Sequence, residues 1–348
     1  MNKLNVDVVV IGAGQAGLAM SYRLKNAGVS HLILERQPAA GGSWPSYYDS
    51  LTLFSPAGYS SLPGLEFPGG AKRYPKRDEV TAYLRQYASA FDLPVRANSE
   101  VVEVISEASQ HRVKLADGAV ITAQAVVVAT GGFNTPHLPG IPGRQLYQGT
   151  ILHSSAYRTP TGFEGKRVVV VGAANSAVQI AHELHSTATV VLATREPVKF
   201  MPQRFLGFDF HDWLKWTGLG NSRWLSDQST PVLDDGRYRH ALSTGAISRR
   251  EMFTAFTNDG VVWPNAEIQA VDAVIFATGF RPNVSFLPRE ALDPDRRALH
   301  SQGVSTTIKG LYYLGLPLQR NFASATLRGV GSDSLGVLAS IMSHLRPM

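Results

Sequence analysis

The sequence predicts an α/β protein with two Rossmann-like dinucleotide-binding domains of the three-layer ββα type. Two segments carry this prediction, because each runs from an apolar strand through a glycine-containing turn into a helix. The first covers residues 6–28 and the second covers residues 166–184. A further apolar strand follows each helix and completes a βαβ unit. The chain of 348 residues is long enough for two domains.

The first unit carries the complete glycine signature of a dinucleotide-binding turn. Its turn reads Gly12-Ala-Gly14-Gln-Ala-Gly17, and the strand after its helix ends at Glu35. The three glycines allow a tight turn, a close approach to a pyrophosphate and close packing of helix on strand. A carboxylate at the strand end accepts hydrogen bonds from a ribose but repels a 2′-phosphate. The first site is therefore predicted to bind FAD or NAD rather than NADP.

The second unit repeats this layout with an altered turn and the opposite charge. Its turn reads Gly172-Ala-Ala174-Asn-Ser-Ala177, and the strand after its helix ends at Arg195. The spacing from the first glycine to Arg195 equals the spacing to the carboxylate of the first unit. A guanidinium is a planar, bidentate partner for phosphate, so Arg195 indicates NADPH. Ala174 adds a methyl group where the backbone approaches a pyrophosphate, which predicts a looser fit.

Two repeated segments indicate how the chain passes between the domains. Asp117-Gly118 precedes an apolar strand that ends in Ala129-Thr130-Gly131. Asp259-Gly260 likewise precedes a strand that ends in Ala277-Thr278-Gly279. We expect a hairpin turn at each Asp-Gly and a buried strand before each Ala-Thr-Gly, where the chain crosses between domains.

The predicted FAD-binding domain is discontinuous and comprises residues 1–155 and 282–348. The NADPH-binding domain, residues 156–281, is inserted in it. An aromatic-rich insertion at about residues 200–240 lies within the second domain; its aromatic residues include Trp213, Trp216 and Trp224. We expect the tail to end in a helix over residues 333–345.

Composition excludes several function classes. The chain has no cysteine, which rules out a disulfide framework, a thiolate nucleophile and a dithiol redox centre, and we expect no metal site. The formal net charge is +6, but no basic run or aromatic-interleaved basic patch indicates a nucleic-acid partner. Neither a signal-peptide pattern nor an apolar run of ~18 residues is present, so we expect a cytoplasmic protein without an integral membrane segment. The oligomeric state stays open, with a homodimer as one alternative.

Taken together, the motifs resemble the class B flavin-dependent monooxygenases, in the small bacterial form of the flavin-containing monooxygenases. Besides the two turns, the resemblance rests on Gly41-Gly42-Ser43-Trp44 and on Ala277-Thr-Gly-Phe-Arg-Pro282. Its most specific part is Tyr147-x-Gly149-x-x-x-His153-x-x-x-Tyr157, which is similar to a motif of that family. The final Tyr157 favours the N- or S-oxygenating branch, because the Baeyer–Villiger branch usually has Trp there. The layout is also related to that of flavoproteins with two dinucleotide-binding domains, such as thioredoxin reductase.

The resemblance implies an FAD-dependent enzyme that uses NADPH and O2. In this family a C4a-hydroperoxyflavin transfers one oxygen atom to a soft nucleophile, a nitrogen, sulfur or metalloid centre of a small molecule. No particular catalytic side chain is implied; His153 and Tyr157 are candidates for the interface of NADP and flavin, and a structural role for His153 is the alternative. Two other functions stay open. One is an NADPH-dependent flavin reductase or oxidase acting on quinones, metal ions or a partner without a dithiol. The other is a flavin-binding redox sensor with an inactive nicotinamide site.

The expected cofactor residues lie on the two turns, at the strand ends and in the tail, where the small-residue segment 323–330 is predicted to pack close to the flavin ring. Asn175 and Ser176 either donate to the pyrophosphate or cap the second helix. For FAD the predicted residues are Gly12, Gly14, Gln15, Ala16, Gly17, Glu35, Arg36, Gly42, Ser43, Trp44, Val102, Thr130, Gly131, Asn321, Phe322 and Ala323. For NADPH they are Gly172, Ala173, Ala174, Asn175, Ser176, Arg195, Thr278 and Gly279.

Overall fold

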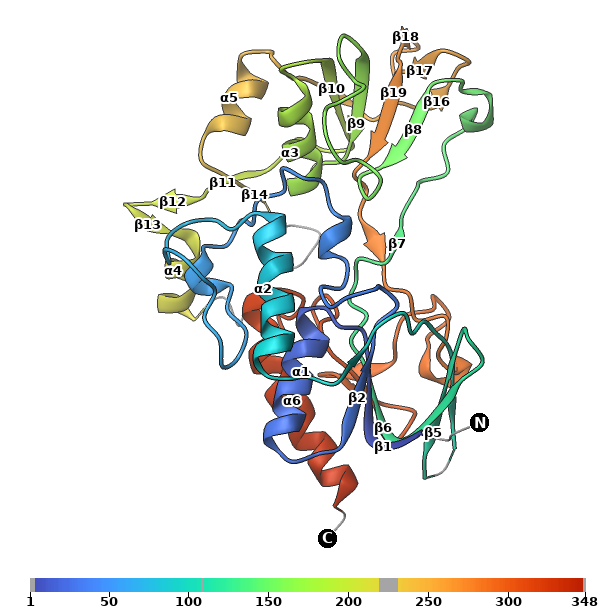
Figure 1. The fold of residues 1–348 in the computed structure, drawn as a ribbon. Helices are drawn as coiled ribbons and strands as arrows, with labels where there is room; N and C mark the ends of the chain where they lie inside the picture. The colour runs from blue at the N-terminus through green and yellow to red at the C-terminus, as the bar shows by residue number, and fades with distance from the viewer. Residues whose placement is uncertain (1–3, 108, 219–230, 347–348) are drawn as a thin grey trace.

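The computed structural model describes residues 4–107, 109–218 and 231–346 and arranges them in two lobes, one above the other in Figure 1. Over these residues, the lower lobe contains a nine-stranded sheet with the order β21-β22-β23-β6-β1-β2-β3, to which β5 and β4 are attached through β6. The central pairs of β1 with β2 and β6 are parallel, as in a Rossmann unit. The strands are β1 (Leu4–Ile11), β2 (His31–Leu34), β3 (Val95–Arg96), β4 (Val101–Ser106), β5 (His111–Leu115), β6 (Val120–Val128), β21 (His300–Ser301), β22 (Val304–Ser305) and β23 (Leu311–Tyr313).

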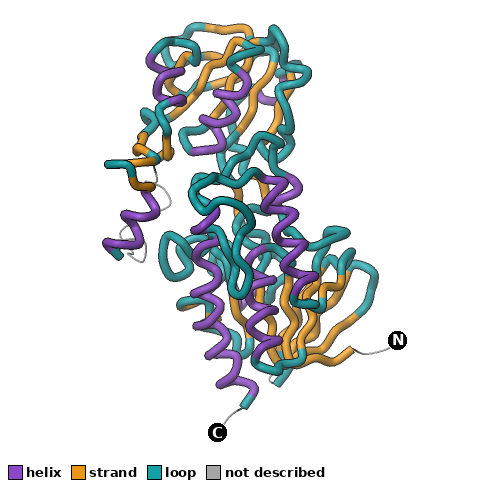
Figure 2. The backbone as a smooth tube through the Cα atoms, turned by 60° about the vertical axis from the view of Figure 1, so that its left-hand side comes forward, coloured by secondary structure: helices purple, strands orange, loops and turns teal. Residues whose placement is uncertain are grey.

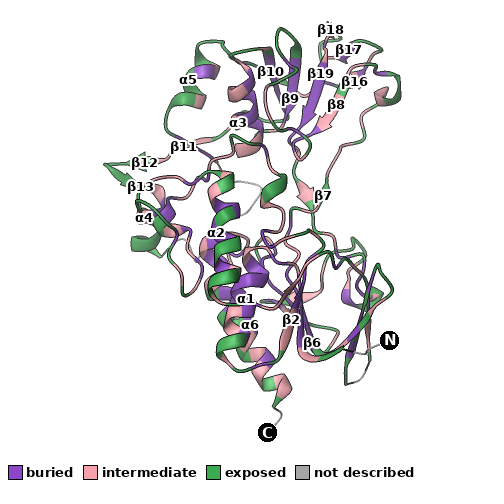
Figure 3. Ribbon diagram, viewed as in Figure 1, coloured by how far each residue is buried: buried purple, intermediate pink, exposed green. Residues whose placement is uncertain are grey.

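Both faces of the lower sheet are covered, which explains why its strands read as continuous apolar runs. Val8 and Val10 on β1 share a core with the helices on one face, whereas Val9 and Ile11 share a core with β4 and β5 on the other face. Figure 3 shows these central strands as buried. The result is a β layer, a second β layer and a helix layer. The helices are α1 (Gln15–Asn26), α2 (Arg77–Ala90) and α6 (Leu327–Leu345).

The upper lobe repeats the same layering around a five-stranded parallel sheet with the order β15-β10-β9-β19-β8. Val168 and Val170 on β9 pack in one core with α3, while Val169 and Val171 pack in another with Trp263. The prediction of two Rossmann-like units of the ββα type is therefore confirmed. The strands are β8 (Thr150–His153), β9 (Arg167–Val171), β10 (Thr189–Thr194), β15 (Ser248–Glu251) and β19 (Ala273–Phe276). The covering elements are α3 (Asn175–Leu184), α5 (Arg237–Ser243), β16 (Ala255–Phe256), β17 (Gly260–Val262) and β18 (Ile268–Ala270).

The chain crosses between the lobes twice, and the two crossings lie side by side. β7 (Thr135–Pro136) and β20 (Phe280–Arg281) form a short antiparallel pair, and each follows one of the Ala-Thr-Gly segments. Figures 1 and 2 show this narrow connection between the lobes. Since β8 pairs with β19, the upper sheet already includes residues before the predicted domain boundary at residue 155. We therefore propose the crossing at residues 135–136 as the first boundary.

Both predicted hairpins are present. β5 and β6 pair antiparallel on either side of Asp117-Gly118. β16 and β17 pair antiparallel, with Asp259 just before β17 and Gly260 as its first residue. Apolar strands joined by Asp-Gly are therefore a reliable hairpin signal in this chain.

The tail helix α6 begins at Leu327, so the predicted start at residue 333 is wrong. The two glycines of its first turns, Gly329 and Gly331, are unfavourable to a helix by propensity, but packing overrides propensity here. A Cβ at Gly329 would lie 1.9 Å from the carbonyl oxygen of Ala323, so only glycine allows the helix to start this close to the preceding turn. Thr326 caps the helix, because its side chain accepts from the Gly329 amide at 3.2 Å.

The aromatic-rich insertion extends from the upper lobe and contacts the lower one (Figure 1). Its elements are β11 (Phe200–Pro202), β12 (Arg204–Phe205), β13 (Phe208–Asp209), α4 (Phe210–Thr217) and β14 (Val232–Asp234). The buried carboxylate of Asp209 accepts from Tyr74 of the lower lobe, and Asp212 accepts from Tyr59 at 2.6 Å. These bonds attach the insertion to the loop around residues 52–76. Trp224 lies outside the described residues.

None of the helices that the structure describes has both the length and the apolar character required to cross a membrane.

Buried histidines predict a loss of stability in acid. His111 is 1% exposed, and its burial lowers its pKa from 6.5 to about 4. His111 takes up a proton at a higher pH in the unfolded chain than in the folded protein. The free energy of unfolding is therefore not reduced by His111 above about pH 6.5, and it decreases as the pH falls from there toward 4. We expect His111→Asn to reduce the loss of unfolding free energy between about pH 7 and pH 4.5 by about 2 kcal/mol, measured by urea denaturation. The exposed His240→Asn is the control and should leave this difference unchanged; an equal effect of both variants would contradict the assignment.

Candidate functional site

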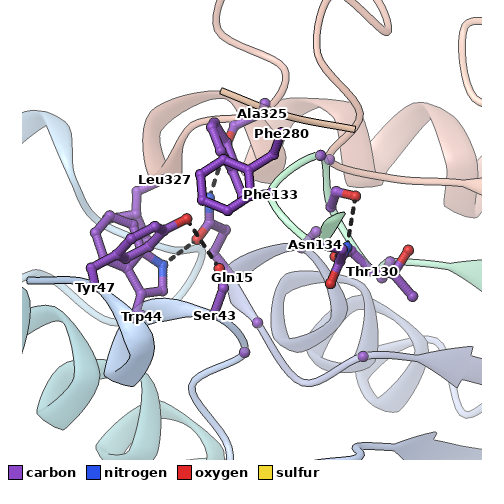
Figure 4. Close-up of a pocket in the computed structure, with 18 of the residues that line it drawn as sticks. Gln15, Ser43, Trp44, Tyr47, Thr130, Phe133, Asn134, Phe280, Ala325 and Leu327 are labelled. Carbon is purple, nitrogen blue, oxygen red and sulfur yellow. Dashed lines mark hydrogen bonds between the residues drawn. The ribbon is translucent and has the colours of Figure 1, made fainter. Parts of the chain in front are cut away.

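A cavity of about 320 Å³ lies between the lobes and is lined by residues from both of them. Figure 4 shows side chains of α1, of the loop after β2 and of the tail converging on it. The N-termini of α1 and α3, one from each βαβ unit, both contribute to its lining. Of the residues predicted for FAD, Gly12, Gly14, Gln15, Ala16, Glu35, Arg36, Gly42, Ser43, Trp44, Thr130 and Gly131 line this cavity. Of those predicted for NADPH, Asn175 and Ser176 line it.

The first glycine turn has open space only where a ligand is expected. Gly12 has a φ of 104°, and a Cβ there would lie 2.8 Å from the carbonyl oxygen of Ala129. A Cβ at Gly17 would lie 1.8 Å from the Gly12 oxygen, so Gly17 serves helix packing and does not line the cavity. At Gly14 the nearest atom to a built Cβ is the Cα of Gly42, at 3.7 Å. Gly14 is therefore the position of the turn at which space remains for a ligand.

Glu35 ends β2 at the edge of the cavity and is 3% exposed. Its carboxylate accepts from the backbone amides of Ala13 at 2.7 Å and Gln37 at 2.9 Å. These two bonds fix both oxygens, each of which keeps a further lone pair for a hydroxyl donor. Arg36 follows it and donates to Asn134 at 3.4 Å, on the far side of the cavity mouth.

A hydrogen-bonded chain connects the first helix with the tail across the cavity (Figure 4). Trp44 Nε1 donates to Gln15 Oε1 at 2.6 Å, and Gln15 Nε2 donates to the carbonyl oxygen of Ala325 at 2.9 Å. Beside this chain, Ser43 Oγ lies 3.2 Å from the Tyr47 hydroxyl, and burial raises the pKa of Tyr47 to about 12. Trp44, Gln15 and the tail therefore form one connected wall.

The tail lines the cavity within the predicted segment 323–330, but not at the three positions predicted for FAD contact. Ala325, Thr326 and Leu327 line the cavity, whereas Asn321, Phe322 and Ala323 do not. The reason is a tight turn: Asn321 Oδ1 accepts from the Ala323 amide, and the Ser324 hydroxyl accepts from the Arg320 and Asn321 amides. The polar side chains of this turn bond to the backbone of the turn itself. The residues at the start of α6 therefore line the cavity in their place.

Val102 is also misplaced by one residue. Val101 lines the cavity, whereas Val102 is 45% exposed. The pairing of β4 with β5 shifts register between Val101 and Glu103, so a bulge interrupts the alternation of side chains at Val102.

Two buried polar atoms near the cavity have no partner among the described residues. They are Thr130 Oγ1, at the end of β6, and Asn175 Oδ1, at the start of α3. Buried polar groups in proteins are nearly always hydrogen-bonded, so each of these two atoms is a candidate contact for a ligand group. One atom belongs to each of the two βαβ units.

The second turn keeps the backbone geometry of the first despite its alanines. Gly172 has a φ of 139°, and a Cβ there would lie 2.5 Å from the carbonyl oxygen of Ala277. Ala174 at the N-cap of α3 has φ −99° and ψ 179°, close to the −78° and −173° of Gly14 in the first turn. Both Ala173 and Ala174 are exposed. The alanine methyl is thus accommodated without strain.

The remaining predicted NADPH residues lie outside the cavity. Arg195 follows β10, is exposed, and has no carboxylate partner among the described residues. Thr278 donates to the carbonyl oxygen of His137, and Gly279 accepts from a ring nitrogen of His153, so both belong to the crossing between lobes.

His153 supports the crossing rather than lining the cavity. Its Nε2 lies 2.9 Å from the Gly279 oxygen, while its Nδ1 accepts from the Ser155 amide at 3.1 Å. Nε2 therefore carries the proton, and burial lowers the pKa of His153, which favours this neutral form. The ring also packs edge-on against Phe280, at 4.7 Å, and Phe280 lines the cavity. Tyr157 is buried and donates to Glu183 at 2.9 Å, away from the cavity.

Sequence reasoning missed much of the apolar lining. Phe280 had a signal, since it directly follows the second Ala-Thr-Gly. The loop of residues 52–55 had none, because it follows no helical or strand periodicity. Other missed lining residues include the apolar Phe133 and Phe286 and the polar Asn134, Gln179 and Asn283.

Within the described ranges there is no group of three or more His, Cys, Asp or Glu side chains that could hold a metal ion.

The chain is similar to known oxidoreductases over nearly its whole length. The model of the pyridine nucleotide-disulphide oxidoreductase family matches residues 9–206. An uncharacterized oxidoreductase, CzcO-like, from Geobacillus kaustophilus is 37% identical and covers 97% of this chain and 99% of its own. Indole-3-pyruvate monooxygenase YUCCA1 of Oryza sativa is 30% identical and covers 97% of this chain and 92% of its own.

A solved structure extends the likeness to three dimensions. The flavin-containing monooxygenase from Stenotrophomonas maltophilia is 32% identical, has a TM-score of 0.87, and covers 99% of this chain and 100% of its own. The absence of cysteine excludes the dithiol branch of the wider family. The chain therefore belongs to the pyridine nucleotide-disulphide oxidoreductase family and, within it, to the flavin-containing monooxygenases.

Proposed function

We propose that this protein is an FAD-dependent, NADPH-using monooxygenase that oxygenates a soft nitrogen, sulfur or metalloid centre of a small molecule. The observation that carries the proposal is the single cavity lined by the helix N-termini of both βαβ units. In the overall reaction the substrate, O2, NADPH and a proton yield the oxygenated substrate, NADP⁺ and water.

FAD fits the first unit on observations of this chain. The open position at Gly14 leaves space for a pyrophosphate at the N-terminus of α1, whose dipole favours negative charge. Glu35 offers fixed lone pairs to a ribose, and the unpaired Thr130 Oγ1 offers a further contact. When bound, FAD supplies the redox chemistry, taking a hydride from NADPH and activating O2.

The protein contributes binding, orientation and a dry cavity. Phe54, Phe133 and Phe280 line the space between the lobes, and the last two rings are 5.7 Å apart in an edge-on contact. Water exclusion favours oxygen transfer to the substrate over loss as hydrogen peroxide. The only carboxylates in the described lining are Glu35 and Glu100, both at the end of the cavity where we place the ribose, so the proposal requires no acid or base side chain.

NADPH is proposed to bind at the second unit. Asn175 Oδ1 is buried and unpaired at the N-terminus of α3, where a pyrophosphate is expected. Arg195, which directly follows β10 and has no carboxylate partner among the described residues, would bind a 2′-phosphate.

Isotope labelling tests the reaction type. With labelled O2 and methyl para-tolyl sulfide as substrate, we expect the label in the sulfoxide. Hydrogen peroxide without labelled product would identify a flavin reductase or oxidase instead. If NADPH fails to bleach the bound flavin under anaerobic conditions, the protein is a flavin-binding redox sensor and the proposal is wrong.

A substitution at Gly14 tests the flavin site. Gly14→Val adds a side chain to an extended backbone position with no close protein neighbour, so the fold should tolerate it while the pyrophosphate is excluded. We expect flavin content to fall at least about tenfold, with an unchanged circular dichroism spectrum of the cofactor-free protein. Gly140→Val, at an exposed glycine where a Cβ would have no neighbour within 4 Å, is the control and should retain its flavin.

A substitution at Arg195 tests the nucleotide preference. Arg195→Ala removes a charge-assisted contact, so kcat/KM for NADPH should fall about tenfold or more while that for NADH stays unchanged. Stopped-flow reduction of the flavin by each nucleotide measures the effect. Arg297→Ala, an exposed arginine of the lower lobe, is the matched control. An unaltered preference for NADPH would remove Arg195 from the site.

A further inference from the structure

A second cavity, of about 240 Å³, lies beside the first and shares a wall with it. Thr52, Leu53, Phe54 and Gln179 line both cavities. Apart from this shared wall, the second cavity has its own lining, and no residue predicted to bind FAD or NADPH belongs to it.

The second cavity is built from both lobes and from the insertion. Gln179, His182 and Glu183 come from one face of α3, since they are spaced three and four residues apart. Leu233 of β14 and the start of α5 close the upper side, and Tyr74 closes the lower side. In Figures 1 and 2, α3 and β14 lie next to the loop of the lower lobe, in agreement with this lining.

Two side chains present hydrogen-bond acceptors to this space. Tyr74 donates its own proton to Asp209, and burial raises the pKa of Tyr74 to about 12, so its hydroxyl stays protonated. Its oxygen accepts from Arg204 and has one further lone pair. Glu183 accepts from Tyr157 through Oε2 at 2.9 Å, and no described protein group donates to its Oε1.

Among the described lining residues of the second cavity, Glu183 carries a negative charge and Arg237 a positive one. Arg237, its cationic residue, is neutralised by Asp235, since Arg237 Nε donates to both carboxylate oxygens at 2.8 and 3.0 Å. His182 has a pKa lowered by burial and is neutral near pH 7. Glu183 is left without a cationic partner among the described residues.

We propose that the second cavity binds the cationic head of the organic substrate, an ammonium group held by Glu183 and Tyr74. The apolar part of the same molecule then extends past Phe54 and Leu53 into the first cavity, where its soft atom is oxygenated. This inference rests on the proposed monooxygenase function, and it assigns to Glu183 a role in substrate specificity that differs from cofactor binding.

A pair of sulfides tests the proposal. Methyl para-tolyl sulfide is neutral, and para-(methylthio)benzylamine carries an ammonium group at neutral pH with the same reacting sulfur. The holoenzyme should prefer the ammonium sulfide in kcat/KM by about tenfold, and Glu183→Gln should reduce this preference to near unity. Flavin content and the KM for NADPH should not change. Glu103→Gln, an exposed carboxylate on β4, is the matched control and should keep the preference.

A second variant tests the cavity itself without removing a charge. Ser50 is exposed at the rim, so Ser50→Trp should block the space without disturbing the fold. We expect a higher KM for the ammonium sulfide and an unchanged rate of NADPH oxidation without substrate. An effect of either variant on the KM for NADPH alone would assign the cavity to the dinucleotide and overturn the proposal, as would equal use of the two sulfides by the unmodified enzyme.

Calorimetric titration separates this inference from the proposed function. If neither sulfide is oxygenated but the ammonium sulfide still binds in a Glu183-dependent manner, the monooxygenase proposal fails and the cation site stands. If the sulfides are oxygenated and Glu183→Gln has no effect, the monooxygenase proposal stands and the cation site is wrong.

Discussion

Each lobe depends on one close backbone contact, between the first glycine of its turn and the alanine carbonyl of the Ala-Thr-Gly segment. A Cβ would lie 2.8 Å from the Ala129 oxygen at Gly12 and 2.5 Å from the Ala277 oxygen at Gly172. Neither distance leaves room for a side chain, and both glycines have positive φ. The contact fixes the ends of neighbouring parallel strands, and so it explains why the glycine turn and Ala-Thr-Gly recur together.

The same contact determines where the cavity forms. Directly after each Ala-Thr-Gly, the chain leaves its lobe as β7 or β20, and these segments pair with each other. Both turns therefore lie at the side of their lobe that faces the crossing, with the N-termini of α1 and α3 directed to the same space. His153 stabilises this arrangement by binding Gly279 and by packing on Phe280. A residue outside the cavity thus positions an aromatic side chain within it.

The features that could be predicted from the sequence are those that short stretches of the chain determine by themselves. The strands, turns and helices of both units are set by short-range patterns of apolar residues and glycine, and they were predictable. The loop of residues 52–55 was not, because long-range packing sets its position: the His211 ring of the insertion stacks on Phe54 at 6.2 Å. The bulge at Val102 was missed because it depends on the pairing of β4 with β5. The early start of α6 at Leu327 was missed for a different reason, since it depends on the close approach of Gly329 to the Ala323 carbonyl oxygen, which helix propensity does not reveal.

The two glycine turns have similar backbone geometry, but the first is covered by other parts of the chain and the second is exposed. This difference affects how tightly each cofactor would be bound. Over the first turn the chain folds back at Gly42, where a Cβ would lie 2.8 Å from the Cα of Gly14. The backbone at Gly42 therefore shields one side of this turn, which suits a resident cofactor. The second turn carries exposed Ala173 and Ala174. A dinucleotide bound there loses less water and meets less resistance on leaving, which suits a cosubstrate that exchanges in every cycle. We therefore expect the methyl group of Ala174 to reduce the affinity for NADPH only slightly, because the proposed site is open at this position.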